Sequence, residues 1–87
     1  MKLIKFYATW CAPCKALTQV IERNKGEIPE QMEVIEIDVD QDNNSAKEFQ
    51  VRGVPTMILL DDANKEYRRH VGMLNDQQFK EFLIGRG

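Results

Sequence analysis

Cys11 and Cys14 are the residues of this 87-residue chain best suited to covalent chemistry, and they are its only cysteines. They lie between an apolar run at residues 3–7, typical of a strand, and a helical pattern at residues 15–21. A cysteine at the start of a helix meets free backbone N–H groups and the positive end of the helix dipole, which stabilise a thiolate. The second thiol lies one turn away, within reach of a disulfide, and Pro13 fits the first helical turn.

Other uses of two cysteines agree less well with this sequence. A structural zinc ion needs four ligands, and His70 is the only histidine in the chain. Two inert, buried cysteines would need neither the strand-to-helix junction nor this spacing, whereas Cys-x-x-Cys in a strand–helix–strand unit indicates redox chemistry. We expect Cys11 to be an exposed nucleophile and Cys14 its buried partner, because Cys14 shares one helical stripe with Leu17 and Ile21.

The composition is that of one soluble, folded domain covering residues 1–87, with 43% hydrophobic and 30% charged residues. A net charge of -2 provides no basic face for nucleic acid, and the short basic run at residues 68–70 is typical of a solvated strand face. No apolar stretch is long enough to cross a bilayer, and the first residues lack a secretory signal pattern. These features predict a cytoplasmic protein without nucleic-acid or membrane partners, where a cysteine pair is more often catalytic than structural.

Hydrophobic periodicity predicts the order β-α-β-α-β-β-α, an α/β sandwich in which three helices flank a mixed four-stranded sheet. The first two strands form a parallel strand–helix–strand unit, and the last two strands pair antiparallel. Asn75 caps the last helix with Gln78 as its capping-box partner, and residues 85–87 form an irregular tail. The predicted strands are residues 2–7, 32–39, 54–60 and 67–71, and the predicted helices begin near Cys14, Ser45 and Asn75.

Four segments of the chain resemble the thioredoxin family, and they occur in the family's order along nearly the whole sequence. A lone Cys-x-x-Cys is weak evidence, but Trp-Cys-x-Pro-Cys followed by Val-Pro-Thr at this distance is specific. The segments are FYATWCAPCK at residues 6–15, DVDQ at residues 38–41, VRGVPT at residues 51–56 and VG at residues 71–72.

The resemblance implies a thioredoxin-like fold and a thiol–disulfide oxidoreductase that reduces protein disulfides. Cys11 attacks a substrate disulfide and Cys14 resolves the mixed disulfide, which leaves a disulfide between the two in the protein. A cis peptide bond before Pro55 leaves neighbouring backbone groups free for an extended substrate. The residues that the resemblance places in an apolar substrate groove are Trp10, Pro13, Val54, Pro55 and Gly72.

The resemblance also implies how the disulfide is recharged. No cofactor is bound, and electrons come from a thioredoxin-reductase-like flavoprotein that uses NADPH and pass to disulfide-containing proteins such as ribonucleotide reductase. Two alternatives stay open: a glutaredoxin-like protein recharged by glutathione, which the short length favours, and a non-catalytic thioredoxin-fold subunit of a larger machine. Trp10 and the Ala12-Pro13 pair between the cysteines favour the thioredoxin interpretation over the glutaredoxin one.

Three features depart from the family pattern. Ala12-Pro13 replaces the common Gly-Pro, and the chain begins where the family's second strand begins, so we expect a core without the usual first strand and helix. The strand at residues 32–39 is then a sheet edge whose charges disfavour pairing, which predicts a monomer. Lys5 and Glu36 stand where the family has a buried aspartate and its lysine partner. They form either a swapped ion pair that tunes the pKa of the thiols, or a lysine that reaches solvent beside an exposed glutamate.

Overall fold

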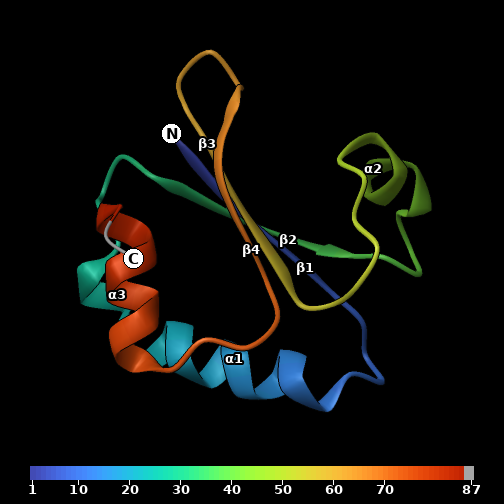
Figure 1. The fold of residues 1–87 in the computed structure, drawn as a ribbon, viewed down its shortest axis with the longest axis horizontal. Helices are drawn as coiled ribbons and strands as arrows, with labels where there is room; N and C mark the ends of the chain where they lie inside the picture. The colour runs from blue at the N-terminus through green and yellow to red at the C-terminus, as the bar shows by residue number, and fades with distance from the viewer. Residues whose placement is uncertain (86–87) are drawn as a thin grey trace.

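The computed structural model describes residues 1–85 and has the predicted order of elements (Figure 1). Gly85 caps the last helix in the left-handed conformation, and the remainder of the expected tail, residues 86–87, lies outside the described residues. The strands are β1 (Lys2–Tyr7), β2 (Glu33–Asp38), β3 (Thr56–Leu60) and β4 (Glu66–Val71). The helices are α1 (Ala12–Arg23), α2 (Asn43–Glu48) and α3 (Asp76–Ile84), and a 3-10 turn (Lys25–Glu27) follows α1.

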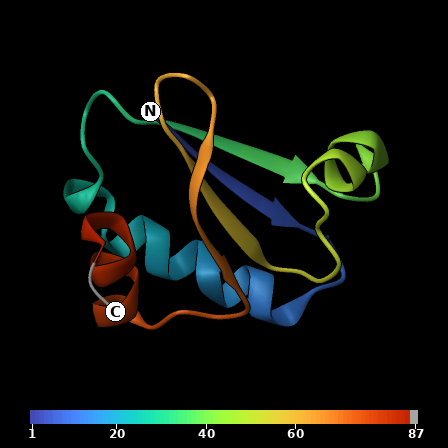
Figure 2. The same ribbon diagram turned by 45° about the horizontal axis from the view of Figure 1, so that its top comes forward.

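The four strands form one mixed sheet in the order β2-β1-β3-β4 (Figure 2). β1 pairs in parallel with β2 and antiparallel with β3, and β3 pairs antiparallel with β4. Because β1 is central and covered on both faces, its apolar residues do not simply alternate with polar ones. In this register Lys5 lies between Glu36 of β2 and Met57 of β3.

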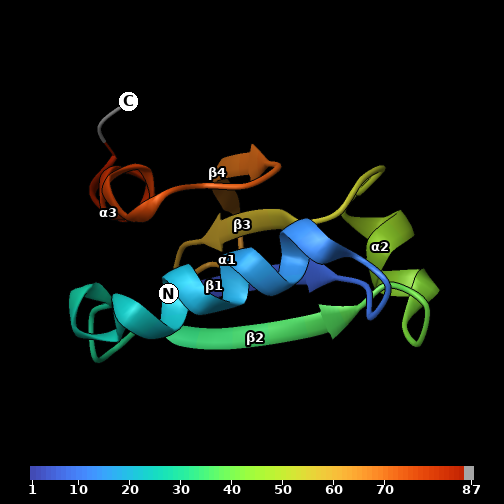
Figure 3. The ribbon, with the colours of Figure 1, turned by 90° about the horizontal axis from the view of Figure 1, so that it is seen from below.

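The hydrophobic core has two parts, one on each face of the sheet. Leu3 of β1 packs with Leu17 of α1 and Phe79 of α3, whereas Ile4 packs with Ala46 of α2 on the opposite face. Since neighbouring strand residues point to opposite faces, the alternation along β1 places Lys5 on the α1 side with Leu3. Figure 3 shows α1 lying along the sheet, with α2 toward the end at which α1 begins.

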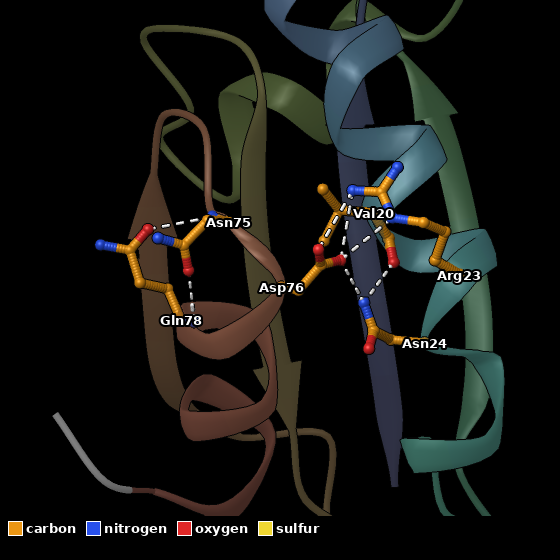
Figure 4. A network of polar contacts seen from close by, with 6 residues as sticks. All are labelled: Val20, Arg23, Asn24, Asn75, Asp76 and Gln78. Atoms are coloured by element: carbon orange, nitrogen blue, oxygen red, sulfur yellow. Dashed lines mark hydrogen bonds and ion pairs between the residues drawn. The ribbon is translucent and has the colours of Figure 1, made fainter.

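The end of α1 is joined to the start of α3 by polar side chains (Figure 4). Asn24, the C-cap residue of α1, donates from Nδ2 to the Val20 carbonyl at 2.8 Å and to Asp76 Oδ1 at 2.7 Å. Arg23 adds two longer contacts to the same carboxylate, both at 3.3 Å. The hydrogen bond from Asn24, together with the charge of Arg23, lowers the pKa of Asp76.

The N-termini of α2 and α3 are fixed by local caps. Asn75 and Gln78 form the predicted capping box, with each side chain bonded to the other residue's backbone N–H. α2 begins two residues before the predicted Ser45, because Asp42 caps it by accepting from the Ser45 N–H at 3.0 Å. Hydrogen bonds from the Ser45 side chain and backbone lower the pKa of Asp42.

β2 is an edge of the sheet in residues 1–85, as expected for the strand at residues 32–39. Glu33 and Glu36 are exposed along it, as is Val34, whose side chain alternates away from the better-buried Ile35. An edge lined with charge disfavours pairing with another chain. Over the same described residues, the helices are too short or too polar to span a bilayer.

Candidate active site

The two cysteines form a disulfide at the N-terminus of α1. Cys11 is the N-cap residue with extended backbone, and its Sγ accepts a hydrogen bond from the Cys14 N–H at 3.1 Å. The chain reaches this position through a turn in which the Cys11 N–H donates to the Ala8 carbonyl at 3.2 Å. Pro13 lies exposed in the first turn of the helix, where no intrahelical N–H is needed. The predicted strand-to-helix junction is therefore confirmed, with sulfur held against free backbone N–H groups.

The expectation that Cys11 is exposed is wrong for this disulfide form. Cys11 is 4% exposed and Cys14 is 2% exposed, and they pack with Ala8 in one small cluster. The reason is the cap geometry, which turns the Cys11 sulfur back over the helix and toward the loop before β3. Its Sγ lies 3.8 Å from the Val54 carbonyl oxygen, and Val54 itself packs against the cluster.

The loop that contains Pro55 forms the second side of the site. The Val54–Pro55 peptide bond is cis, as predicted. The Gly72 N–H donates to the Pro55 carbonyl at 2.8 Å, which joins the end of β4 to this loop. The Thr56 hydroxyl donates to the Gly53 carbonyl at 2.6 Å and fixes the start of β3. These contacts hold the loop beside the disulfide.

Gly72 has a backbone conformation that favours glycine. Its φ is +103°, in the region that residues with a side chain rarely adopt. No atom lies within 4 Å of the position that a Cβ would take, so the space over this backbone is open. Its neighbours Val71 and Met73 are both exposed apolar residues. Residues 71–73 therefore form an open strip beside the loop of Pro55, with exposed apolar side chains on both sides of Gly72.

Trp10 directly precedes Cys11 in the chain and is 70% exposed. Its Nε1–H donates to Asp40 Oδ2 at 2.8 Å, which fixes the ring against the loop after β2. The ring also lines a hollow of about 400 Å³ together with Val54 and Arg52. Asp40 was not among the residues singled out from the sequence as site candidates. The signal that could have found it is its place just after β2, because the carboxyl ends of parallel strands meet at one edge of a sheet.

Lys5 and Glu36 form an ion pair, with Lys5 Nζ 3.4 Å from Glu36 Oε2. Of the two interpretations left open by the sequence, the lysine that reaches solvent is wrong, because Lys5 is only 2% exposed. The Lys5 ammonium also donates to the Thr18 hydroxyl at 2.5 Å. Thr18 was missed in the sequence, although it lies one helical turn after Cys14 and donates to that residue's carbonyl at 3.0 Å.

The disulfide lies at a helix N-terminus, beside an exposed tryptophan and the open strip at Gly72. This arrangement defines a thiol–disulfide oxidoreductase. Comparison with known proteins agrees, since the Thioredoxin family model matches residues 1–84. The chain belongs to the thioredoxin family. Its redox-active group is the Cys11–Cys14 pair.

Individual relatives extend this result. A thioredoxin from Chlamydia pneumoniae is 37% identical over 84 residues, which make up 97% of this chain and 79% of that protein. The X-ray structure of Fasciola hepatica thioredoxin has a TM-score of 0.84 at 31% identity and covers 99% of this chain and 80% of its own. A bifunctional thioredoxin reductase/thioredoxin from Mycobacterium leprae is 43% identical over 70 residues, 80% of this chain and 15% of that protein.

Proposed function

We propose that Cys11 is the attacking cysteine and Cys14 the resolving cysteine in the reduction of protein disulfides. The observation that carries this assignment is the cap geometry, in which Cys11 Sγ receives the Cys14 N–H and lies beside Val54. A thiolate at that position keeps the same hydrogen bond and the favourable end of the helix dipole. Cys14 is buried in the same cluster one helical turn further on, where it can close the disulfide with Cys11.

The reaction proceeds in two exchanges. The Cys11 thiolate attacks one sulfur of the substrate disulfide, that bond breaks, and the other substrate sulfur leaves as a thiolate that takes up a proton. Cys14 then loses its proton, attacks the Cys11 sulfur and releases the second substrate thiol. Two electrons and two protons have passed to the substrate, and the protein holds the disulfide seen in the structure.

Five residues are proposed to form the groove that receives the substrate. Trp10 and Pro13 are exposed and lie next to the cysteines in the chain, and Gly72 is bonded to Pro55, the neighbour of the Val54 whose carbonyl approaches Cys11. An extended segment laid between them meets backbone groups of the loop before β3 and adds main-chain hydrogen bonds. The full set is Trp10, Pro13, Val54, Pro55 and Gly72.

The electron donor is proposed to be a flavoprotein thioredoxin reductase that uses NADPH. The Mycobacterium leprae relative supports this, because its name joins a thioredoxin reductase and a thioredoxin in one polypeptide. The acceptors are proteins with accessible disulfides, and ribonucleotide reductase is the acceptor that the family resemblance suggests. The protein works as a monomer in this proposal, in agreement with the charged edge of β2.

Insulin reduction tests the proposal. With NADPH and a bacterial thioredoxin reductase, the wild type should precipitate insulin chains, and Cys11→Ser should fall to the uncatalysed rate because the nucleophile is lost. Cys14→Ser should also be inactive but should accumulate a mixed disulfide with insulin, which mass spectrometry detects. A mixed disulfide formed by Cys11→Ser and not by Cys14→Ser would reverse the two roles. Activity with glutathione and glutathione reductase alone would replace the flavoprotein donor with glutathione.

A further inference from the structure

Lys5 is the one buried charged residue in the part of the chain that the structure describes. It lies in the middle of β1, the central strand, on the face that α1 covers. Burying an ammonium group is unfavourable unless it has close partners, so a lysine at this position requires a local explanation. A leucine or methionine of similar volume would fill the same space without that penalty.

Three groups hold the Lys5 ammonium in place. The Thr18 hydroxyl accepts its hydrogen bond at 2.5 Å, and Glu36 Oε2 lies 3.4 Å away. The ring of Tyr7 lies on another side, with its centroid 5.3 Å from Nζ, a cation–π distance. Because the Glu36 side chain is 55% exposed, water screens its charge, and the carboxylate cancels the field of the buried ammonium only in part.

Lys5 is connected to Cys14 by a shared hollow and by hydrogen bonds. Lys5 lines a hollow of about 280 Å³ that Cys14 and Thr18 also line. The Thr18 hydroxyl donates to the Cys14 carbonyl at 3.0 Å, so a continuous chain of hydrogen bonds runs from the ammonium to the backbone of Cys14. Because the Lys5 side chain is buried, water screens its charge less than it screens the charge of an exposed lysine.

We propose that Lys5 is a positioning residue that stabilises the thiolate of the reduced cysteine pair and so makes the couple more oxidising. The proposal rests on the redox function proposed above. When the disulfide accepts two electrons, the two sulfurs become thiols, and one of them ionises as the pH rises. The buried ammonium interacts more strongly with that thiolate than with the neutral disulfide, and stabilising the reduced form raises the reduction potential.

Other charged and titratable groups also face this region. Glu36 on β2 opposes the effect of Lys5, and Glu22 on α1 lines a smaller hollow beside it while pairing with Lys25 at 3.2 Å. Lys15 lines the hollow next to Cys14 and acts in the same direction as Lys5, but it is exposed. Tyr7 contributes its ring face. Among these, only Lys5 has its charge removed from water, so we expect it to have the largest effect.

The test is the reduction potential of the full chain, measured in glutathione redox buffers at pH 6 and at pH 9. For Lys5→Met the equilibrium at pH 9 should shift toward the disulfide by about tenfold, the low end of what one nearby opposite charge does to an ionisation, or about 30 mV. At pH 6 the shift should be smaller, because a smaller fraction of the thiol is ionised at lower pH. Thiolate absorbance at 240 nm should show the corresponding rise in thiol pKa.

Matched variants separate the electrostatic role from a structural one. Lys2→Met removes the same charge from the first residue of the same strand, at the end away from the cysteines, and it should leave the potential unchanged. Lys15→Met should shift it less than Lys5→Met, in the same direction. Glu36→Gln keeps the shape and removes the opposing charge, so it should shift the equilibrium toward the thiols, by less than tenfold because Glu36 is half exposed.

Two results would overturn the proposal. The first is a Lys5→Met protein with the potential and thiol titration of the wild type at pH 9. The second is a Glu36→Gln protein whose shift is absent or has the same sign as that of Lys5→Met, and this variant decides the matter if Lys5→Met does not fold. Failure of the function proposed above looks different, since the wild type would then show a glutathione equilibrium but would not reduce insulin.

Discussion

Helix α1 has two ends that use polar groups in opposite ways. At its C-terminal end, Asn24 and Arg23 meet the carboxylate of Asp76 directly, and the carboxylate and Arg23 are both about half exposed. Toward its N-terminal end, the buried Lys5 ammonium is connected to Cys14 through the Thr18 hydroxyl, and its anionic partner Glu36 is about half exposed. The first arrangement pairs the carboxylate directly with its donors and joins α1 to α3. The second leaves part of a positive charge available to act on sulfur.

This difference indicates that the C-terminal end of α1 contributes to stability, whereas the N-terminal end contributes to the redox reaction. Both ends depend on the same apolar middle, in which Leu17 and Val20 pack against Leu3 and Phe79. A change in this middle should therefore alter the stability of the whole domain. Changes at the two ends should separate stability from redox properties.

Leu17→Ala should lower the free energy of unfolding by about 2–5 kcal/mol, because Leu17 is fully buried and its loss leaves a cavity. Urea denaturation of the oxidised protein measures this. Gln19→Ala, on the exposed side of the same helix, is the matched control and should stay within about 0.5 kcal/mol of the wild type. Equal losses for the two variants would contradict the assignment of the apolar middle.

Much of the fold follows from local signals in the sequence. The strand–helix–strand unit, the cysteines at the helix start and the capping box at Asn75 each depend on residues close together in the chain, and all are present. The burial of Cys11 could not be predicted in the same way. It depends on Val54, which is 43 residues away and reaches the sulfur only through the folding of the loop before β3.

The hydrogen bonds from Lys5 through Thr18 to Cys14 could not be predicted from local signals either. Sequence comparison with the family singled out Lys5 and Glu36, but their depth is set by the packing of α1 on β1. The hydroxyl that connects the ammonium to Cys14 belongs to Thr18, an exposed residue whose type carries no signal by itself. The predicted monomer stays a prediction, which light scattering over a range of concentrations would check.

Asn24→Ala should lower the free energy of unfolding by about 1–3 kcal/mol, less than Leu17→Ala, because it removes two hydrogen bonds from a nearly buried amide. Its reduction potential should equal that of the wild type, since this change lies at the opposite end of α1 from the cysteines. Lys25→Ala, at the next and exposed position, is the control for both measurements. A potential that moves in Asn24→Ala as much as in Lys5→Met would remove the distinction between the two ends.

The smallest expected effect is the pH dependence contributed by Asp76. Its pKa is lowered in the folded protein, first by the hydrogen bond from Asn24 and then by the charge of Arg23, so folding favours the carboxylate. A lowered pKa contributes stability that is present above the unfolded-state value, near pH 4, and is lost as the pH falls through the folded-state value. Asp76→Asn keeps an oxygen that accepts from Asn24 but has no charge to titrate.

The oxidised wild type should therefore lose more Tm between pH 6 and pH 3 than oxidised Asp76→Asn, and thermal denaturation followed by circular dichroism measures both. The variant should keep some acid sensitivity, because Asp42, Asp62 and Glu66 also have lowered pKa values, each through a hydrogen bond from a nearby group. Identical losses in the two proteins would show that the contacts at the C-terminal end of α1 act through shape and hydrogen bonding alone. The charge of Asp76 would then be incidental there, and the contrast with the charge of Lys5 at the other end would be sharper.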